Sequence, residues 1–573
     1  MSDKQLLDRR SIRAAAILAI SAVVSVAYGR GYGSSNQQTY LLEPLHRAHS
    51  ELFARDWLIS NTTQYHPVFA WLVAPFYAVD PGGVMAFALA QLVVMIATYV
   101  LLYRLIAAIA VRGRIAMFLL LVGLLAFTGG RALAGSYLFS DYLQPSSLAT
   151  LGWLAAMVAW LRGQPLRAGV WLALGGVCHV NFLVLGVGLF AALEVSSWRP
   201  GGWRALAGAD VRAGGAADAS RRGVWLRRLA AVVGPSLIVV AVYLPSLIAS
   251  AHARDPDAAL HILVKFHAPG HYDPLRVRRG LVSLLSWLVI AWGAVPVARA
   301  AGQATIDRLW RFAAVATALC VAATAVVSIP AFLGATRLFV WRIGPFAQLA
   351  SQLVVIGAAL APAGSAAAWS PRRKLAAVLG ALAFLGEALL RRHYVDAGAM
   401  AVVGTVGLAS HWLRYRALAL ALAIAACGAA LVDRRRDLIA LPLFAPVCDE
   451  SECALGRWAQ RETPADAVFL VPPYVTWFRL FAARAIVVDS KSPPLYPDEL
   501  LEWYRRMCAV VDARDMPTHE AVEARWDTLT AAQLLSAARR FDAGYILLVK
   551  RAAPRLSAPV AYEDKVFVVY RLP

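Results

Sequence analysis

Residues Arg30–His66, RGYGSSNQQTYLLEPLHRAHSELFARDWLISNTTQYH, decide how the chain is organised. This polar stretch separates an apolar segment near residues 12–29 from another near 84–109, and each matches the ~20 residues that a helix needs to cross a bilayer. The stretch gathers amide, carboxylate and imidazole side chains in one connecting loop. In a membrane protein built on this plan, we expect the chemistry to begin here.

The composition places the whole chain in a membrane. Of its 573 residues, 60% are hydrophobic and only 16% are charged, which soluble domains of this length do not show. The formal net charge is +21. The arginines are dispersed between apolar segments and form no stripe with aromatic residues, so we expect them to orient cytoplasmic loops. Nucleic-acid binding is not expected.

Apolar segments recur as far as residue 432 and predict a mainly α, polytopic transmembrane bundle of about 11–13 spans. The regular segments lie near residues 12–29, 84–109, 115–133, 146–162, 229–250, 280–298, 311–330, 338–361, 374–390, 396–413 and 416–432. Two others are irregular, because 66–79 is short and 168–195 is interrupted at His179. Arginine-rich loops share one side only when 168–195 turns back in the membrane and 66–79 does not cross. We therefore expect a broken helix or re-entrant hairpin at His179.

The same charge pattern orients the chain. The basic N-terminus, followed by an uncleaved first helix, and the Gly-, Ala- and Arg-rich linker 196–228 are expected in the cytoplasm. The outer side then receives the polar stretches 30–66, 134–145, 251–279, 331–340 and everything after about residue 433.

Residues 433–573 have the composition of a small soluble domain appended to the transmembrane domain 1–432. Strands are predicted at 467–471, 485–489, 545–550 and 566–570, and helices at 497–510 and 531–541. This alternation favours an α/β domain. Cys448 and Cys453 form a disulfide if the domain is extracytoplasmic or stay reduced if it is not, and a zinc site lacks further ligands.

Carboxylates in the first outer loop are candidates for a general base. Asp56 and Glu43 are preferred there as catalytic residues. Trp57 follows Asp56, and its ring is suited either to stack on a sugar or to lie at the membrane interface. For each acid, a purely structural role is the alternative.

The next polar positions are candidate binding residues. Asp141 is either an acidic ligand contact or a favourable charge at the N-terminus of the helix that Pro145 opens. His179 and Asn181 lie in an apolar segment, where a polar pair indicates function or a satisfied core position.

The third outer loop carries Lys265, His267 and His271, which suit phosphate or sugar contact. A metal is disfavoured there, because no carboxylate joins these histidines at a typical spacing. Arg342, near the outer face, is suited to bidentate phosphate contact or to snorkelling at the membrane edge.

In the C-terminal domain, Arg479, Arg484, Asp489 and Lys491 cluster around two predicted strands. Period two places Asp489 and Lys491 on one face. Two interpretations are open. These residues form an ion-pair network, or Arg479 and Lys491 contact a lipid-linked phosphate.

The order of these features resembles the GT-C superfamily of membrane glycosyltransferases. The shared features are a basic N-terminus, one helix, a polar outer loop, Tyr65-His66-Pro67 before the next helix, a small-residue helix pair interrupted by a polar turn, and an outer soluble domain. The run Trp458–Arg506, WAQRETPADAVFLVPPYVTWFRLFAARAIVVDSKSPPLYPDELLEWYRR, looks like an uncharacterised group of bacterial polytopic proteins with that architecture.

The resemblance implies an inverting sugar transfer from a polyprenyl-phosphate donor to an envelope acceptor, at the outer face of the bacterial inner membrane. The C-terminal domain is then periplasmic. Asp56 is implied as the proton acceptor, and Arg342, Lys265 or Arg479 as the group holding the lipid phosphate.

One departure from the family concerns the acidic residue that usually follows the first helix as base or metal contact. This chain has Asn36 and Gln37 there, which we take, with His66, as substrate-binding candidates. A divalent metal ion stays open as a cofactor, and the sequence does not specify an oligomeric state. The alternative functions are a non-catalytic transporter of a lipid-linked substrate and a scaffold subunit of an envelope-polysaccharide system.

Overall fold

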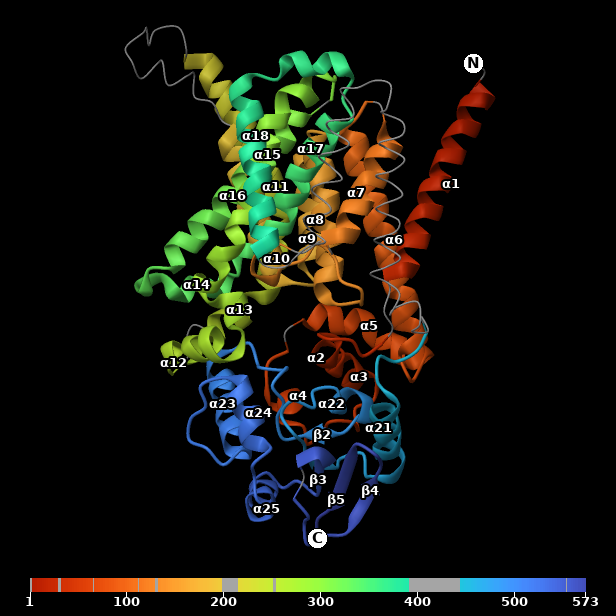
Figure 1. The fold of residues 1–573 in the computed structure, drawn as a ribbon, viewed down its shortest axis with the longest axis vertical. Helices are drawn as coiled ribbons and strands as arrows, with labels where there is room; N and C mark the ends of the chain where they lie inside the picture. The colour runs from red at the N-terminus through yellow and green to blue at the C-terminus, as the bar shows by residue number, and fades with distance from the viewer. Residues whose placement is uncertain are drawn as a thin grey trace.

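The computed structural model describes residues 3–28, 32–64, 66–111, 113–128, 132–197, 215–250, 254–303, 305–390, 444–552 and 554–573. A bundle of long helices stands on a smaller domain that contains the sheet (Figure 1). The predicted spans 396–413 and 416–432, and the predicted domain boundary at 432/433, lie outside the described residues.

The bundle consists of apolar helices, as the composition predicts. Among the described residues, four helices are long and apolar enough to cross a membrane. They are α6 (Val84–Ile109), Gly223–Leu244 within α11 (Gly215–Ser250), α15 (Leu281–Ala300) and α16 (Ile306–Val327). The helix pair Pro330–Leu338 and Val340–Ala359, bent by 46°, makes a fifth candidate. The total of about 11–13 spans stays a prediction.

Further helices complete the bundle. They are α1 (Asp3–Tyr28, apolar over Ala14–Val26), α7 (Arg114–Thr128), α8 (Pro145–Leu161), α9 (Pro165–Gly176), α10 (Val180–Ser197) and α18 (Pro371–Leu390). The bent pair divides into η6 (Pro330–Leu338), η7 (Val340–Ile343) and α17 (Gly344–Ala359). The predicted linker 196–228 is partly wrong, because α11 begins at Gly215; residues 198–214 lie outside the described ranges.

The segment predicted to be interrupted at His179 forms the helical hairpin α9–α10. Gly169, near the start of α9, packs on the backbone of Val232, where a Cβ atom would lie 2.6 Å from the carbonyl oxygen. Near the end of α10, Glu194 pairs with Arg228 at 2.8 Å. Both ends of the hairpin therefore lie beside the same part of α11, and the chain turns back between them. The predicted break is confirmed.

The first polar stretch folds into short helices at the bundle's lower end (Figure 1), namely α2 (Gln37–Tyr40), α3 (Leu42–Ala48) and α4 (Trp57–Asn61). The short apolar segment that follows it forms α5 (Pro67–Val79). The 13 residues of α5 extend about 20 Å, which is short of the ~30 Å hydrocarbon core. Leu41 and Phe53 are fully buried in one hydrophobic core with Phe469 and Phe478 of the soluble domain. The loop thus joins the bundle to the soluble domain.

The soluble domain contains a five-stranded sheet in the order β2-β1-β3-β5-β4. The strands are β1 (Val468–Leu470), β2 (Ala485–Ile486), β3 (Tyr545–Val549), β4 (Val560–Glu563) and β5 (Phe567–Arg571). β1 runs parallel to β2 and β3, and β5 runs antiparallel to β3 and β4. The helices are α21 (Glu450–Glu462), α22 (Phe478–Ala482), α23 (Pro497–Val510), α24 (His519–Trp526) and α25 (Ala531–Arg540). The predicted α/β character is confirmed.

Two details of this domain bear on the sequence predictions. β2 ends at Ile486, so the strand periodicity predicted for Asp489 and Lys491 is wrong. Asp489 is fully buried, whereas Lys491 is half-buried and lines a cavity. Cys448 and Cys453 are joined in a disulfide just before and within α21, which answers the alternative left open by the sequence.

The third polar stretch also packs on the soluble domain. It forms α12 (Pro256–His261), the π-helix η4 (Ile262–His267), α13 (Pro269–Tyr272) and α14 (Pro274–Val277). Ile262 and Phe266 belong to the same hydrophobic core as Trp503 of α23.

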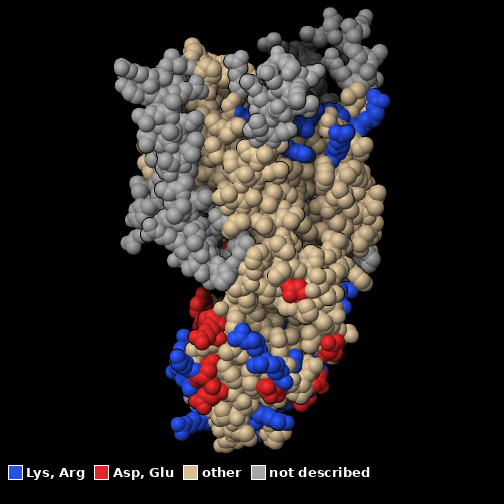
Figure 2. All heavy atoms as spheres, turned by 90° about the vertical axis from the view of Figure 1, so that its right-hand side faces the viewer, with Lys and Arg blue, Asp and Glu red and all other residues tan. Residues whose placement is uncertain are grey.

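Charged side chains are distributed unevenly along the molecule. On the face drawn in Figure 2, Lys and Arg gather at the end of the bundle far from the soluble domain, and acidic and basic side chains mix over that domain. Between these regions, the described residues on this face form an almost uncharged band, as a membrane-embedded surface requires.

Candidate functional site

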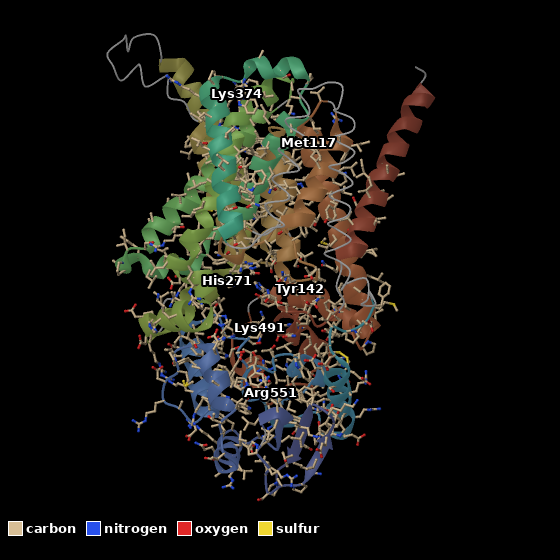
Figure 3. All side chains as sticks on the ribbon, viewed as in Figure 1. Met117, Tyr142, His271, Lys374, Lys491 and Arg551 are labelled. Carbon is tan, nitrogen blue, oxygen red and sulfur yellow. A yellow bond between two sulfur atoms is a disulfide. The ribbon has the colours of Figure 1, made fainter. Side chains whose placement is uncertain are left out.

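A cavity of about 780 Å³ lies where the bundle meets the soluble domain. Its lining draws on all five polar stretches that loop charge assigned to one side, with Asn36, Tyr142, His271, Arg337 and Lys491 as one representative of each. Figure 3 labels Tyr142, His271 and Lys491 at this junction. The convergence of segments from across the sequence makes this cavity the candidate site.

The cavity is cationic. Arg337, Arg342 and Lys491 line it, and no aspartate or glutamate occurs among the described lining residues. Arg337 donates a hydrogen bond to the carbonyl of Pro256 at 2.9 Å. Positive side chains in a lining without described carboxylates, partly shielded from water, favour an anionic ligand.

Arg342 lies on the bundle side of the cavity. Phe339 adopts left-handed dihedrals (φ 46°) between η6 and η7, and this turn directs the short helix with Arg342 toward α10. The Arg342 guanidinium donates to Nε2 of His179 and lies 5.0 Å and 5.4 Å from the ring centroids of Phe339 and Phe182. The break between α9 and α10 thus places His179 beside the arginine.

The protonation of His179 follows from this contact. An arginine only donates, so Nε2 of His179 accepts and Nδ1 carries the proton. His179 is 6% exposed, and its Nδ1 is buried without a hydrogen-bond partner within the described part of the chain. The ring of His66 packs 4.5 Å from that of His179, and burial, followed by the charge of Arg342, lowers the pKa of His66 to about 3.

His271 belongs to α13 and lines the cavity. Its Nδ1 is 2.7 Å from the carbonyl oxygen of Ala134, so Nδ1 donates and Nε2 keeps the lone pair. Gly135 has φ +68°, and a Cβ atom there would lie 2.8 Å from Cε1 of the His271 ring. Burial lowers the pKa of His271, which favours its neutral form.

The soluble domain supplies the wall that carries Lys491. The backbone amides of Lys491 and Ser492 donate to Oδ1 of Asp489 at 2.8 and 2.7 Å. The Nζ atom of Lys491 has no hydrogen-bond or ion-pair partner among the described residues. Burial lowers the pKa of Lys491, and the charge of Asp489 offsets part of this effect.

Two neighbouring histidines also line the cavity, and His267 lies within electrostatic reach of Lys491. His267, the last residue of η4, and His519, the first residue of α24, both line the cavity, with their ring centroids 5.6 Å apart. Burial, then the neighbouring His519 and Lys491, lowers the pKa of His267 to about 3. Nδ1 of His267 and Nε2 of His519 are buried without partners in the described ranges.

Asp56, the preferred catalytic acid, lies outside the cavity lining. It caps α4, where its Oδ1 accepts from the amides of Leu58 and Ile59. Its Oδ2 accepts from Nε of Arg479 at 2.9 Å, and Nη1 of Arg479 donates to Oδ2 of Asp489 at 2.5 Å. All three charged residues are at most 2% exposed. This geometry gives Asp56 a structural role and does not support its assignment as a base.

No curated protein sequence matches the chain. A family model described as a domain of unknown function (DUF6798) matches residues 450–510. Among solved structures, ArnT from Cupriavidus metallidurans bound to undecaprenyl phosphate is 14% identical over 98% of this chain and 97% of that chain, with a TM-score of 0.41.

Two structures from Archaeoglobus fulgidus are also similar. The oligosaccharyltransferase in the apo form is 11% identical over 93% of this chain and 69% of that chain, with a TM-score of 0.39. AglB in complex with an inhibitory peptide and a dolichol-phosphate is 10% identical over 94% and 70% of the respective chains, with a TM-score of 0.37. At such low identity and TM-score, no residue's role is transferred from them.

The other first-loop candidates separate into cavity residues and scaffold residues. Asn36 lines the cavity and donates to Oε1 of Gln144 at 3.1 Å. Gln37 is buried and bonds the backbone of Gly33 and Leu143. Gln37 therefore fixes the loop rather than lining the cavity.

Glu43 and Trp57 also lie outside the lining. Glu43 pairs with Arg47 one turn farther along α3, at 2.6 Å. The Trp57 ring lies 4.5 Å from the guanidinium of Arg506, so its face is occupied by a cation.

Three candidates in the later stretches lie outside the lining as well. Lys265 forms an ion pair with Asp273 at 2.9 Å, and Asn181 donates to the carbonyl of Leu338. Asp141 is half-buried just before α8. Asp141 does not cap α8, because Gln144 is the N-cap residue of that helix. A favourable effect of its charge on the helix N-terminus stays a prediction.

The residue types present do not fit a divalent metal. Among the described residues, no three His, Cys, Asp or Glu side chains are grouped as a metal site. The cavity histidines have no carboxylate beside them in the lining, so we derive no step through a metal.

Sequence reasoning missed His519 and Phe339. His519 lies more than 200 residues from its neighbour His267 along the chain, and neither residue belongs to a recognisable motif. The left-handed turn at Phe339 has no signal, because the residue is neither glycine nor asparagine.

Proposed function

We propose that this protein is a GT-C-like membrane glycosyltransferase that binds a polyprenyl-phosphate-linked sugar in the junction cavity. The observation that carries the proposal is the lining itself, which contains Arg342 on the bundle side and no carboxylate among the described residues. A phosphate held beside such a cation, between membrane helices and a soluble domain, is stabilised far more strongly than in water.

Arg342 is proposed to hold the phosphate of the donor. Its guanidinium lies on the bundle side, against the rings of Phe182 and Phe339. Nε2 of His179 accepts from this guanidinium and holds it in place. A fixed cation beside the phosphate stabilises the negative charge that develops when the sugar leaves.

His271 is proposed as the proton acceptor. An acceptor hydroxyl attacks the anomeric carbon, the bond from that carbon to the phosphate oxygen breaks, and the phosphate leaves with the electron pair. The hydroxyl proton passes to Nε2 of His271, whose lone pair is fixed by the Nδ1 contact with Ala134. A single displacement of this kind inverts the anomeric configuration. Asp56 and Glu43 are the competing proposal for the base.

The assay uses purified full-length protein in nanodiscs with polyprenyl-phosphate sugars. We expect donor consumption in the parent protein, loss of consumption in Arg342→Met and His271→Gln, and retained consumption per folded molecule in Glu43→Gln and Asp56→Asn. Loss in the two acid variants, with folded protein and unchanged donor binding, would return the base to the first loop.

The specific membrane and orientation form part of the proposal. We place the chain in the bacterial inner membrane, with the N-terminus cytoplasmic and the cavity and soluble domain periplasmic, because basic side chains gather at the opposite end (Figure 2). In intact cells, a membrane-impermeant thiol reagent is expected to label Lys565→Cys and to spare Lys374→Cys. The reverse labelling would invert the orientation.

A non-catalytic carrier or scaffold is the second candidate. The observation that favours it is the absence of a carboxylate among the described lining residues, because a carboxylate is a common general base. This candidate predicts tight binding of polyprenyl phosphate without turnover of any donor sugar.

A further inference from the structure

The cations of the cavity lie on different walls. Arg342 belongs to the bundle and contacts His179, whereas Lys491 belongs to the soluble domain and neighbours His267. Both cations contribute to the lowered pKa of His271, so this residue lies within electrostatic reach of each. In Figure 3, His271 lies on the bundle side of Lys491.

The nearest carboxylate does not neutralise the Lys491 ammonium by contact. Oδ1 of Asp489 accepts from the amides of Lys491 and Ser492, and Oδ2 accepts from Arg479. No hydrogen bond or ion pair links Nζ of Lys491 to a carboxylate of the described residues. A half-buried ammonium without a counter-charge is costly, and an anionic ligand would remove that cost.

Two imidazoles complete the same wall. Nδ1 of His267 and Nε2 of His519 are buried and lack partners in the described part of the chain. The π-helix η4 ends at His267, and such irregular turns often occur at functional sites. Each neutral imidazole carries one N–H, so the wall offers donors beside a cation.

The proline-rich segment that follows Lys491 is conformationally restricted. Pro493, Pro494 and Pro497 line the cavity next to Lys491, and the backbone of this segment is tied through Ser492 to Thr39 of the first loop at 2.8 Å. Proline fixes φ, so little conformational entropy is lost when a ligand binds here.

Resting on the proposed function, we infer that Lys491, His267 and His519 form a second anion subsite, separate from the donor phosphate at Arg342. This subsite takes an acidic group of the acceptor, a phosphate or a carboxylate. The acceptor is therefore an anionic glycan or lipid rather than a neutral alcohol.

The test measures acetylation of Lys491 in the full-length protein in nanodiscs by peptide mass spectrometry. Inorganic phosphate is the probe, and exposed Lys565 is the internal control. We expect phosphate to protect Lys491 both without and with saturating undecaprenyl phosphate, because the two anions occupy different subsites. His267→Gln with His519→Gln should weaken phosphate protection about tenfold, consistent with lost hydrogen bonds to a charged group.

Matched variants separate the subsites. Lys491→Gln should leave undecaprenyl phosphate affinity within about twofold while weakening phosphate binding, measured by calorimetry, about 10–100-fold; Lys491→Arg should restore much of it. Arg342→Met should weaken undecaprenyl phosphate binding and leave phosphate binding nearly unchanged. Lys565→Gln should change neither.

Three results would overturn the inference. Protection of Lys491 by undecaprenyl phosphate without added phosphate would mean one shared anion site, with the donor site intact. Protection by undecaprenyl diphosphate, equal to that by phosphate, would assign the subsite to a second phosphate of the donor. Absence of any phosphate protection would remove the subsite. Failure of undecaprenyl phosphate to bind at all would instead refute the proposed function and, with it, the acceptor role.

Discussion

Two clusters of charge lie at the same junction between bundle and soluble domain, and they differ in how their charges are paired. In the buried cluster Asp56–Arg479–Asp489, both carboxylates contact the arginine, and all three side chains are at most 2% exposed. In the cavity, Arg342 and Lys491 have no carboxylate beside them among the described lining residues. The paired cluster holds the first loop on the soluble domain, and the cavity presents positive charge that no described lining carboxylate neutralises.

The largest contrast should be in turnover between His271 and Asp56. His271→Gln keeps the contact with Ala134 possible but removes the basic nitrogen, so turnover should fall about 10²–10⁴-fold with unchanged folding. Asp56→Asn should lose turnover only as far as the folded fraction falls. Single-turnover rates, corrected for folded protein by size-exclusion chromatography, give the comparison. Equal losses per folded molecule would place Asp56 in the chemistry.

Arg479→Met should destabilise the protein by about 3–5 kcal/mol, because it leaves two carboxylates buried without a counter-charge. The matched variant Arg342→Met strands no buried carboxylate but leaves Nε2 of His179 without its donor, so it should cost less, about 1–3 kcal/mol. Denaturant unfolding of the soluble domain, followed by tryptophan fluorescence in nanodiscs, measures both. Similar losses in the two variants would erase the proposed difference between the clusters.

Arg342→Met should instead weaken undecaprenyl phosphate binding about 10–100-fold, the range for a lost hydrogen bond between charged groups. Arg342→Lys keeps the charge but loses the planar, two-pronged geometry, and it should fall between the parent and the methionine variant. Calorimetric titration in nanodiscs provides the affinities. A parent-like affinity in Arg342→Met would move the phosphate site elsewhere.

Local signals in the sequence account for what was predicted correctly. Hydropathy delimited α6, and loop charge together with His179 predicted the hairpin α9–α10, since both signals lie within a short window. Five polar stretches assigned to one side do meet in one cavity. Arg342 and His271 were recognised by their residue types in those stretches.

Pairings across the chain could not be predicted. Asp56 and Arg479 are 423 positions apart, and nothing near either residue announces the other. An acid in a polar loop therefore suggested a base, while the folded chain uses it as a helix cap and an ion-pair partner. His519 was missed for the same reason, because only the tertiary fold brings it to His267.

The titration of Lys491 should show a smaller but directional effect. Burial lowers the pKa of this ammonium, and only the deprotonated amine is acetylated, so Lys491 should begin to react at lower pH than exposed Lys565. Bound phosphate stabilises the charged form and should shift the Lys491 profile to higher pH. A phosphate-independent profile would contradict anion binding at this wall.

The smallest effect is expected from the disulfide Cys448–Cys453, which belongs to neither charge cluster. It closes a loop with a sequence separation of 5, for which the chain-entropy relation gives about 2 kcal/mol at most. Helix α21 has a second restraint at this end, because Asp449 and Glu452 form a capping box. Cys448→Ser with Cys453→Ser should therefore increase amide hydrogen exchange only in the first turn of α21.

Phosphate protection of Lys491 and the affinity for undecaprenyl phosphate should stay unchanged in this double variant. The cavity and the buried cluster are held by contacts that do not involve the two cysteines. A change in either property would mean that the start of α21 is coupled to the cavity wall.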